Sequence, residues 1–389
     1  MSRRSQATLA AFFLAAFPAA AAAKVTFTGY GDLRYNAGAN LTLEGPTATL
    51  AKFGAVPEHA TSRGFNASVM GLFASTQIQE NLQFLSDITF RSIGNTVGQL
   101  QIQYAYLDWT PLADSRVRAG RVTLPFGYFN ENRFYAFQRY EVTAPVFQSS
   151  ILGLPIADWG VTGAQTFHFS KANVEAAAYV VNGYGNVSGQ KSQLRSESIP
   201  GGISLANNLA ATDNNHKPAL GGRLSLRDIG GRNLDTGVSY YWGDWDASGL
   251  EPMYMVDAHL HAAAAGFDLL VEALHIGVRG DTGFAQSIGS PDWSTDGGFA
   301  TLSYDRINVA GGQLAPFVQY ESYSSRPNNG DPTREILEAG TAGAALKLSP
   351  QLMLKAEYLH LGYMIPDRAG GGSASLRGDE TQLAAVVTF

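Results

Sequence analysis

The last twelve residues of the chain read Gly378-Asp-Glu-Thr-Gln-Leu-Ala-Ala-Val-Val-Thr-Phe389. Side chains of a strand alternate between its two faces, so this stretch has one apolar face and one face that becomes polar toward its start. The two sets are Phe389, Val387, Ala385, Leu383 and Thr381, and Thr388, Val386, Ala384, Gln382 and Glu380. With nothing after it, such a strand suits the closing strand of a membrane barrel, because only closure leaves no unpaired edge in lipid. The last strand of a soluble β-domain is the alternative.

The other end of the chain has the three parts of a secretory signal peptide. Arg3 and Arg4 are followed by the apolar run Leu9–Phe17 and the small residues Ala19–Ala23. We expect cleavage after Ala23, which leaves residues 24–389 as the mature chain. No later stretch approaches the ~20 consecutive apolar residues of a transmembrane helix. A membrane protein with this sequence must therefore be a β-barrel.

The composition fits an exported barrel and argues against one class of partner. The chain has no cysteine, so disulfides do not stabilise it. Without Arg3 and Arg4, 25 of the 27 basic residues remain against 33 acidic ones, and this formal charge of −8 disfavours nucleic-acid binding. The 43 glycines and an aromatic content of 11% are consistent with many tight turns and with aromatic rings at membrane surfaces.

Alternation with a period of two recurs throughout the mature chain. In 99–109, for example, Leu100, Ile102, Tyr104 and Tyr106 are expected on one face and glutamines on the other. Connections between such segments are alternately short and long, as in outer-membrane barrels. The sixteen expected strands are 24–36, 63–79, 81–94, 97–110, 115–123, 158–169, 172–182, 217–228, 232–243, 252–264, 266–278, 294–305, 312–324, 333–348, 350–363 and 378–389. We therefore predict an all-β, transmembrane, antiparallel barrel of about 16 strands.

Sixteen strands enclose a water-filled lumen, whereas eight would be filled by side chains. Aromatic residues also gather near the expected strand ends, where membrane proteins carry interfacial belts. They are Tyr104, Tyr106 and Trp109; Tyr240, Tyr241, Trp242 and Trp245; and Tyr358 and Tyr363.

The stretch from Arg116 to Val161 carries most of the functional signal. The expected strand 115–123 places Arg116 and Arg118 in the lumen, while Arg121 falls out of phase and predicts a bulge there or the end of the lipid-facing zone. Residues 124–157 are too many for a simple turn. This third loop combines aromatic residues with Glu131, Arg133, Arg139 and Glu141. We expect it to fold into the lumen as a charged constriction; a loop that caps the barrel from outside is the alternative.

In these residues the chain resembles the phosphate-selective porin O/P group and related sixteen-stranded porins. The resemblance rests on Gly120-Arg121, Pro125-Phe126-Gly127 and Asp158-Trp159-Gly160-Val161. It implies a trimeric outer-membrane barrel of a Gram-negative bacterium with an inward third loop. Anion selectivity in that group depends on an arginine ladder and a lysine-rich constriction, and 124–158 contains no lysine. The resemblance therefore implies a porin for small hydrophilic solutes or ions, with anions such as phosphate as one candidate class.

The expected lumen lining contains both signs of charge. The pore-lining and constriction candidates are Arg34, Arg91, Arg116, Arg118, Arg133, Arg139, Glu131, Glu141, Arg223 and Arg227. Acidic residues expected on the same faces are Asp32, Asp87, Asp257, Asp268, Glu272 and Glu357. Phe389 is expected to be the signal that the outer-membrane assembly machinery recognises.

Other functions have weaker support in the sequence. Asp257, His259 and His261 share one face of an expected strand, and the histidines could bind a metal, but no third strong ligand is fixed, so no cofactor is expected. None of the seven histidines lies in a known catalytic motif, so we expect no enzyme, although an outer-membrane hydrolase remains an alternative. A barrel that sheathes a partner protein is the other alternative.

Overall fold

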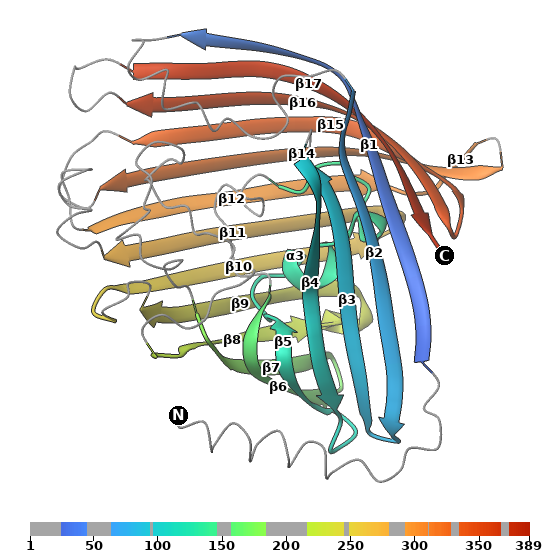
Figure 1. Cartoon of the computed structure of the whole chain (residues 1–389), viewed down its shortest axis with the longest axis vertical. Coiled ribbons are helices and arrows are strands. Elements are labelled where there is room, and N and C mark those ends of the chain that lie inside the picture. Colours follow the sequence, from blue (N-terminus) through green and yellow to red (C-terminus); the bar gives the residue numbers. More distant parts are fainter. Residues whose placement is uncertain are drawn as a thin grey trace.

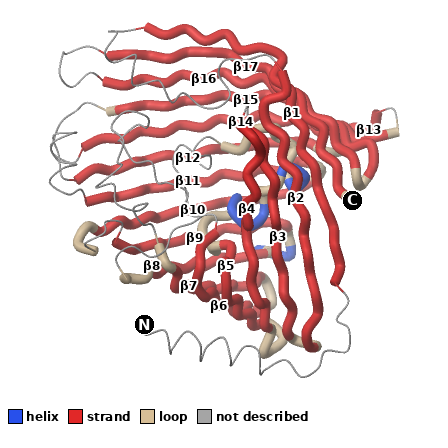
Figure 2. The backbone as a smooth tube through the Cα atoms, in the orientation of Figure 1, coloured by secondary structure: helices blue, strands red, loops and turns tan. Residues whose placement is uncertain are grey.

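One closed antiparallel sheet forms the molecule (Figure 1). The computed structural model describes residues 25–44, 64–93, 96–145, 157–183, 216–244, 249–279, 292–309, 311–327, 334–366 and 373–389. Within them, the strands of the wall pair in chain order, and the first pairs with the last. Figure 2 shows this part of the chain almost entirely as strand, with only short helical turns. No helix among the described residues is long and apolar enough to cross a bilayer.

The strands are β1 (Val25–Glu44), β2 (Gly64–Gln79), β3 (Leu82–Ile93), β4 (Thr96–Trp109), β5 (Ser115–Thr123), β6 (Ala157–Phe169), β7 (Ala172–Val181), β8 (Ala219–Arg227), β9 (Asn233–Asp244), β10 (Pro252–Ala264), β11 (Phe267–Arg279), β12 (Asp292–Tyr304), β13 (Ile307–Val309), β14 (Gly312–Pro327), β15 (Glu335–Ser349), β16 (Leu352–Pro366) and β17 (Ser373–Thr388). The helical turns are α3 (Phe129–Asn132), η2 (Ala136–Gln138) and η4 (Ile229–Gly231).

The wall of the barrel has sixteen strands, as predicted, because β13 is not part of the ring. In the described residues β13 pairs only with β14, from Ile307 opposite Leu314 to Val309 opposite Gly312. β14 then continues past this turn and pairs with β12 inside the wall. Figure 1 shows β13 projecting beyond the rim on the side of the short turns.

The seam between β1 and β17 closes the barrel, which confirms the role predicted for the last strand. The register runs from Tyr30 opposite Thr388 to Glu44 opposite Ser375. Gly29 and Phe389 exchange two backbone hydrogen bonds of 2.6 and 2.9 Å at one end of the seam. Both strands are longer at the loop side than the sequence predicted, because residues 38–44 pair with residues 375–381.

The two faces of the wall differ in chemistry. Along β17 the alternation follows the sequence prediction: Leu383, Val387 and Phe389 are exposed on the outside, whereas Glu380 and Gln382 are buried inside. Exposed large apolar side chains continue around the other strands of the wall. The outward face of the wall is therefore apolar at these positions, and the polar residues between them turn inward.

Two tyrosines expected on the outer face lie inside the barrel, so this part of the prediction was wrong. A register shift between β3 and β4 puts Tyr104 opposite Asp87 and Ile102 opposite Ile88, with Gln103 as the extra residue. Such a bulge reverses the alternation beyond it. Leu100 is 73% exposed on the outside, whereas Tyr106 is 7% exposed on the inside.

The bulge also explains the arginine that seemed out of phase in β5. Pairing of β4 with β5 is unbroken, with Ala105 opposite Arg121, so the irregularity lies in β4 and not at Arg121 itself. The Arg121 Nε donates a 3.1 Å hydrogen bond to the carbonyl oxygen of the bulged Gln103. Arg121 therefore satisfies a carbonyl group that the bulge removes from the ladder.

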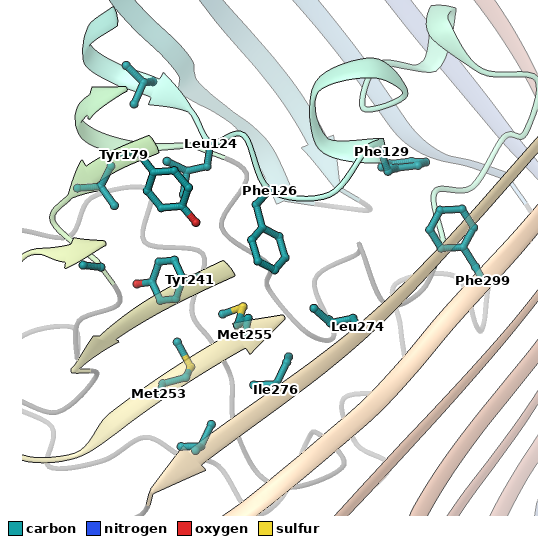
Figure 3. Packing of buried hydrophobic residues seen from close by; sticks show 14 of the residues in the cluster. Leu124, Phe126, Phe129, Tyr179, Tyr241, Met253, Met255, Leu274, Ile276 and Phe299 are labelled. Atoms are coloured by element: carbon teal, nitrogen blue, oxygen red, sulfur yellow. The ribbon is translucent and has the colours of Figure 1, made fainter. Parts of the chain in front are cut away.

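An apolar cluster lies inside the barrel, where the sequence predicted mainly polar lining. Phe126 of the third loop points toward Met255 and Ile276 on the inner wall, and Leu124 belongs to the same cluster (Figure 3). Tyr241, which was expected in an outer belt, is 1% exposed within this cluster, while its neighbours Tyr240 and Trp242 face outward. The loop thus packs against an apolar part of the wall made by β9, β10 and β11.

Two glycines of β15 offer a test of how closely the wall strands approach. A Cβ atom at Gly343 would press on the carbonyl oxygen of Ala356 and on the Cα of Glu357, whereas a Cβ at Gly340 would meet nothing within 4 Å. Gly343→Ala should lower the free energy of unfolding by about 1–3 kcal/mol, as overpacking does. Gly340→Ala should change it by less than about 0.5 kcal/mol. Urea unfolding of the refolded barrel measures both, and equal effects would contradict this account of the packing.

Candidate functional site

The third loop enters the interior of the barrel directly after β5, as predicted. Its described part, residues 124–145, contains α3 and η2, and Figure 1 shows α3 within the ring of strands. Residues 146–156, the rest of the predicted constriction segment, lie outside the described residues. What holds the loop in place defines the candidate site.

The first half of the loop binds the wall through a buried carboxylate. Glu272 of β11 accepts hydrogen bonds from the backbone N–H groups of Tyr128 (3.2 Å) and Phe129 (3.0 Å). The N–H of Gly127 donates to the Oγ of Ser239 at 3.0 Å. Gly127 has a φ of 67°, and a Cβ there would collide with the Glu272 carboxylate. Glycine is therefore required where the loop turns over the carboxylate.

Arg223 of β8 binds the same half of the loop. Its Nη1 donates to the carbonyl oxygen of Gly127 at 2.9 Å, and its Nη2 lies 2.6 Å from Glu131. Arg133 further along forms an ion pair with Asp268 of β11. Because several charge-assisted contacts converge, this half of the loop is fixed to β8, β9 and β11.

The second half of the loop binds to β16. The Lys355 ammonium donates to the carbonyl oxygens of Ala136, Arg139 and Glu141 at 2.6, 2.7 and 2.9 Å. All three of its N–H donors are therefore used on the loop. Two residues along β16, Glu357 accepts a 2.7 Å hydrogen bond from the N–H of Val142.

These attachments lie far apart around the ring, so the loop crosses the interior. It leaves the wall at β5, contacts β8 to β11, and reaches β16, the strand next to β17 of the seam. The Tyr135 hydroxyl also donates to Asp87 of β3 at 2.7 Å, and its ring stacks on Phe137. In the closed ring, β3 and β16 flank the seam on either side, whereas β8 to β11 lie across the barrel from it.

A cavity of about 240 Å³ remains between α3 and the wall formed by β5 to β8. Four arginines line it: Arg116, Arg118, Arg223 and Arg227. Glu131 enters it from the loop and Glu175 from β7. Burial raises the pKa of the Glu131 carboxyl, but Arg223 and Arg118 outweigh this effect, so its pKa lies below the ordinary value. Glu131 is therefore an anion at neutral pH.

The residues predicted from the sequence separate into three groups. Arg116, Arg118, Glu131, Arg223 and Arg227 meet at the cavity. Arg133, Arg139 and Glu141 are buried at 8, 4 and 3% exposure, and Arg139 donates to carbonyl oxygens of the loop itself. Arg34, which is paired with Asp32 at 2.7 Å, lies close enough to the second group for its charge to act on Arg139. Arg91 belongs to β3, but its side chain lies outside the described part of the structure.

His259 and His261 face the interior, as their spacing predicted. Nδ1 of His261 lies 3.1 Å from the hydroxyl of Tyr128, and its Nε2 lies 3.1 Å from Asp268. The ring of His259 packs against Tyr128 at a centroid distance of 5.5 Å. The histidines thus contact the loop, and no group of three or more His, Cys, Asp or Glu side chains in the described chain is arranged to hold a metal ion.

Sequence reasoning missed the roles of Lys355 and Glu175. Their alternation with apolar neighbours placed Lys355 on the polar face of its strand, and the same spacing was available for Glu175. Their partners could not be inferred, because a loop can meet any strand around the ring. Asp108 of β4, which accepts a 3.4 Å hydrogen bond from the Nε of Arg118, was missed for another reason: the bulge at Gln103 changes the face on which it lies.

Removal of the Lys355 ammonium should make the third loop more accessible to protease. Lys355→Met keeps the apolar stem but deletes three charge-assisted hydrogen bonds, so the free energy of loop opening should fall by at least about 1.4 kcal/mol. Trypsin cleavage after Arg139 of the folded barrel should then be about tenfold faster or more. Lys347→Met, an exposed lysine of β15, is the matched control. Equal cleavage of the two variants would contradict the anchoring role.

Comparison with known proteins agrees with this fold. No family model matches the chain, and no curated protein matches its sequence. Among solved structures, the barrel is similar to an anion-selective porin from Comamonas acidovorans (TM-score 0.55, 13% identity, covering 94% of this chain and 100% of that one). It is also similar to outer-membrane expressed OmpT of Vibrio cholerae (0.55, 10%, 96% and 100%) and to the outer membrane channel DcaP of Acinetobacter baumannii (0.54, 13%, 96% and 99%). At these identities the likeness establishes a shared sixteen-stranded barrel fold.

Proposed function

We propose that this protein is an outer-membrane porin of a Gram-negative bacterium, through which small hydrophilic solutes diffuse passively. The observation that carries the proposal is the third loop, which crosses the interior and is tied to the wall by Glu272, Arg223 and Lys355. A segment held across a lumen by charged side chains narrows the passage and gives it a fixed electric field. The residues proposed to line the passage are those of the cavity together with Arg34 and Arg91.

The outer surface supports a place in the membrane. Its exposed apolar side chains would lie in lipid, and a closed ladder leaves no backbone group unpaired there. Export would rely on residues 1–23, the predicted signal peptide, which lie outside the described residues. The outer-membrane proteins among the structural neighbours support the same location.

Anions, phosphate included, are the solutes that the lining favours. The exposed guanidinium groups of Arg116 and Arg227 present positive charge, while Glu131 and Glu175 are directed onto arginines. One of the similar structures is an anion-selective porin, which supports this preference.

Two other functions make different demands on the barrel. A sheath around a partner protein would need the interior that the loop now occupies. A hydrolase would need a nucleophile and base within hydrogen-bond reach. Neither would produce stepwise ion currents, so a conductance recording separates the porin from both.

Purified protein added to a planar bilayer should produce discrete conductance steps. We also infer a homotrimer, supported by a trimeric form of OmpT from Vibrio cholerae, and a trimer should close in three equal steps. Replacing Tyr128–Pro145 by a short glycine–serine linker should raise the conductance of each step by about twofold or more, because the crossing segment is removed. Absence of conductance steps would contradict the porin proposal. Unchanged conductance after the replacement would show that the loop does not narrow the passage.

Phe389 is proposed to be the residue that the assembly machinery recognises. It ends the seam on Gly29 and is exposed on the outer surface. Phe389→Ser should reduce the folded protein in outer-membrane fractions several-fold, while refolding of the purified chain in detergent should proceed. Phe169→Ser, at another exposed strand end, is the matched control. Normal assembly of the Phe389 variant would exclude this role.

A further inference from the structure

The cavity beside α3 combines buried and exposed arginines in a way that general permeability does not require. Arg223 is 3% exposed and Arg118 16%, whereas Arg116 and Arg227 are 52 and 37% exposed. Glu131 lies on the two buried guanidinium groups, 2.6 Å from Arg223 and 3.5 Å from Arg118. The cavity therefore has one end where a carboxylate is already bound and another end where arginines face solvent.

The unused donors of these arginines show what the cavity could accept. Each guanidinium has five N–H groups. Among the described residues, Arg227 contacts one acid, Glu175 at 2.9 Å, and Arg116 contacts one, Asp108 at 3.5 Å. The Nε of buried Arg223 has no hydrogen-bond partner in the described chain. Donors thus remain at both ends, in a geometry suited to oxyanions.

We propose that this cavity is a binding site for small oxyanions, carboxylates or phosphate, and that Glu131 is a built-in competitor occupying part of it. The proposal deepens the porin function, since a solute would pause here while it crosses the loop. The loop carboxylate contacts Arg223 and Arg118 as the oxygen atoms of a solute would. A solute would first meet the exposed arginines, Arg116 and Arg227, and would compete with Glu131 for the buried pair.

The competitor role makes two substitutions act in opposite directions. Glu131→Gln removes the resident negative charge and frees donors of Arg223 and Arg118, so oxyanions should bind more tightly. Arg116→Gln combined with Arg227→Gln removes the exposed donors, so oxyanions should bind more weakly. Lys355, Glu357 and Glu272 still anchor the loop in both variants.

Calorimetric titration of the detergent-folded barrel with malonate measures the site independently of any ion current. We expect saturable binding by the unchanged protein. The dissociation constant should rise about tenfold or more in the double arginine variant and fall several-fold in Glu131→Gln. Arg232→Gln, on an exposed turn, should leave it unchanged. Arg227→Lys keeps the charge but loses the planar fork, and should weaken binding less than Arg227→Gln.

The outcomes separate this proposal from the porin function. Binding of malonate would point to organic acids, and binding of inorganic phosphate alone to phosphate. If neither malonate nor phosphate binds, or if all folded variants bind with equal affinity, the proposed oxyanion site is wrong even if the barrel conducts ions. Binding with the predicted opposite shifts in a barrel that shows no conductance would keep the site and remove the porin function.

Discussion

Closure of the hydrogen-bonded ladder between β1 and β17 is the constraint on which the rest of the structure depends. An open sheet of this size would leave two rows of unpaired N–H and C=O groups, and the register from Tyr30 to Glu44 removes both. Once the ring is closed, every strand has an inside and an outside. The alternation of side chains then determines which residues meet water and which form the apolar exterior.

Closure also creates an interior in which charged groups must find partners. A buried carboxylate or ammonium is costly unless hydrogen bonds satisfy it. Glu272 and Glu357 accept N–H groups of the loop, and Lys355 donates to its carbonyl groups. Loop backbone and wall side chains thus satisfy each other. This reciprocity explains how a segment of little regular structure is held inside a barrel.

Much of the wall could be predicted from the sequence because a strand's face follows from counting in twos. The sixteen strands, the closing role of β17 and the inward third loop were predicted correctly. This counting gives the wrong face beyond a β-bulge, where a strand contains one extra residue. In β4 the extra residue is Gln103, so Tyr104 and Tyr106 lie on the opposite face from the one predicted. No local signal marks this bulge, because its compensation comes from Arg121 on the next strand.

The candidate site was less accessible to sequence reasoning. The alternation of side chains along the strands placed Arg116, Arg118, Arg223 and Arg227 inside. It could not indicate that they meet at one cavity, because the cavity depends on where the third loop lies. A loop has no period to count, so the partners of Lys355 were not predictable either. Mechanically, a ring of hydrogen-bonded strands can flatten, whereas a loop attached to both sides of the wall resists flattening. Lateral pressure on the wall would therefore be carried across the barrel by residues 127–143, and the shape of the passage would be coupled to the forces acting on its rim.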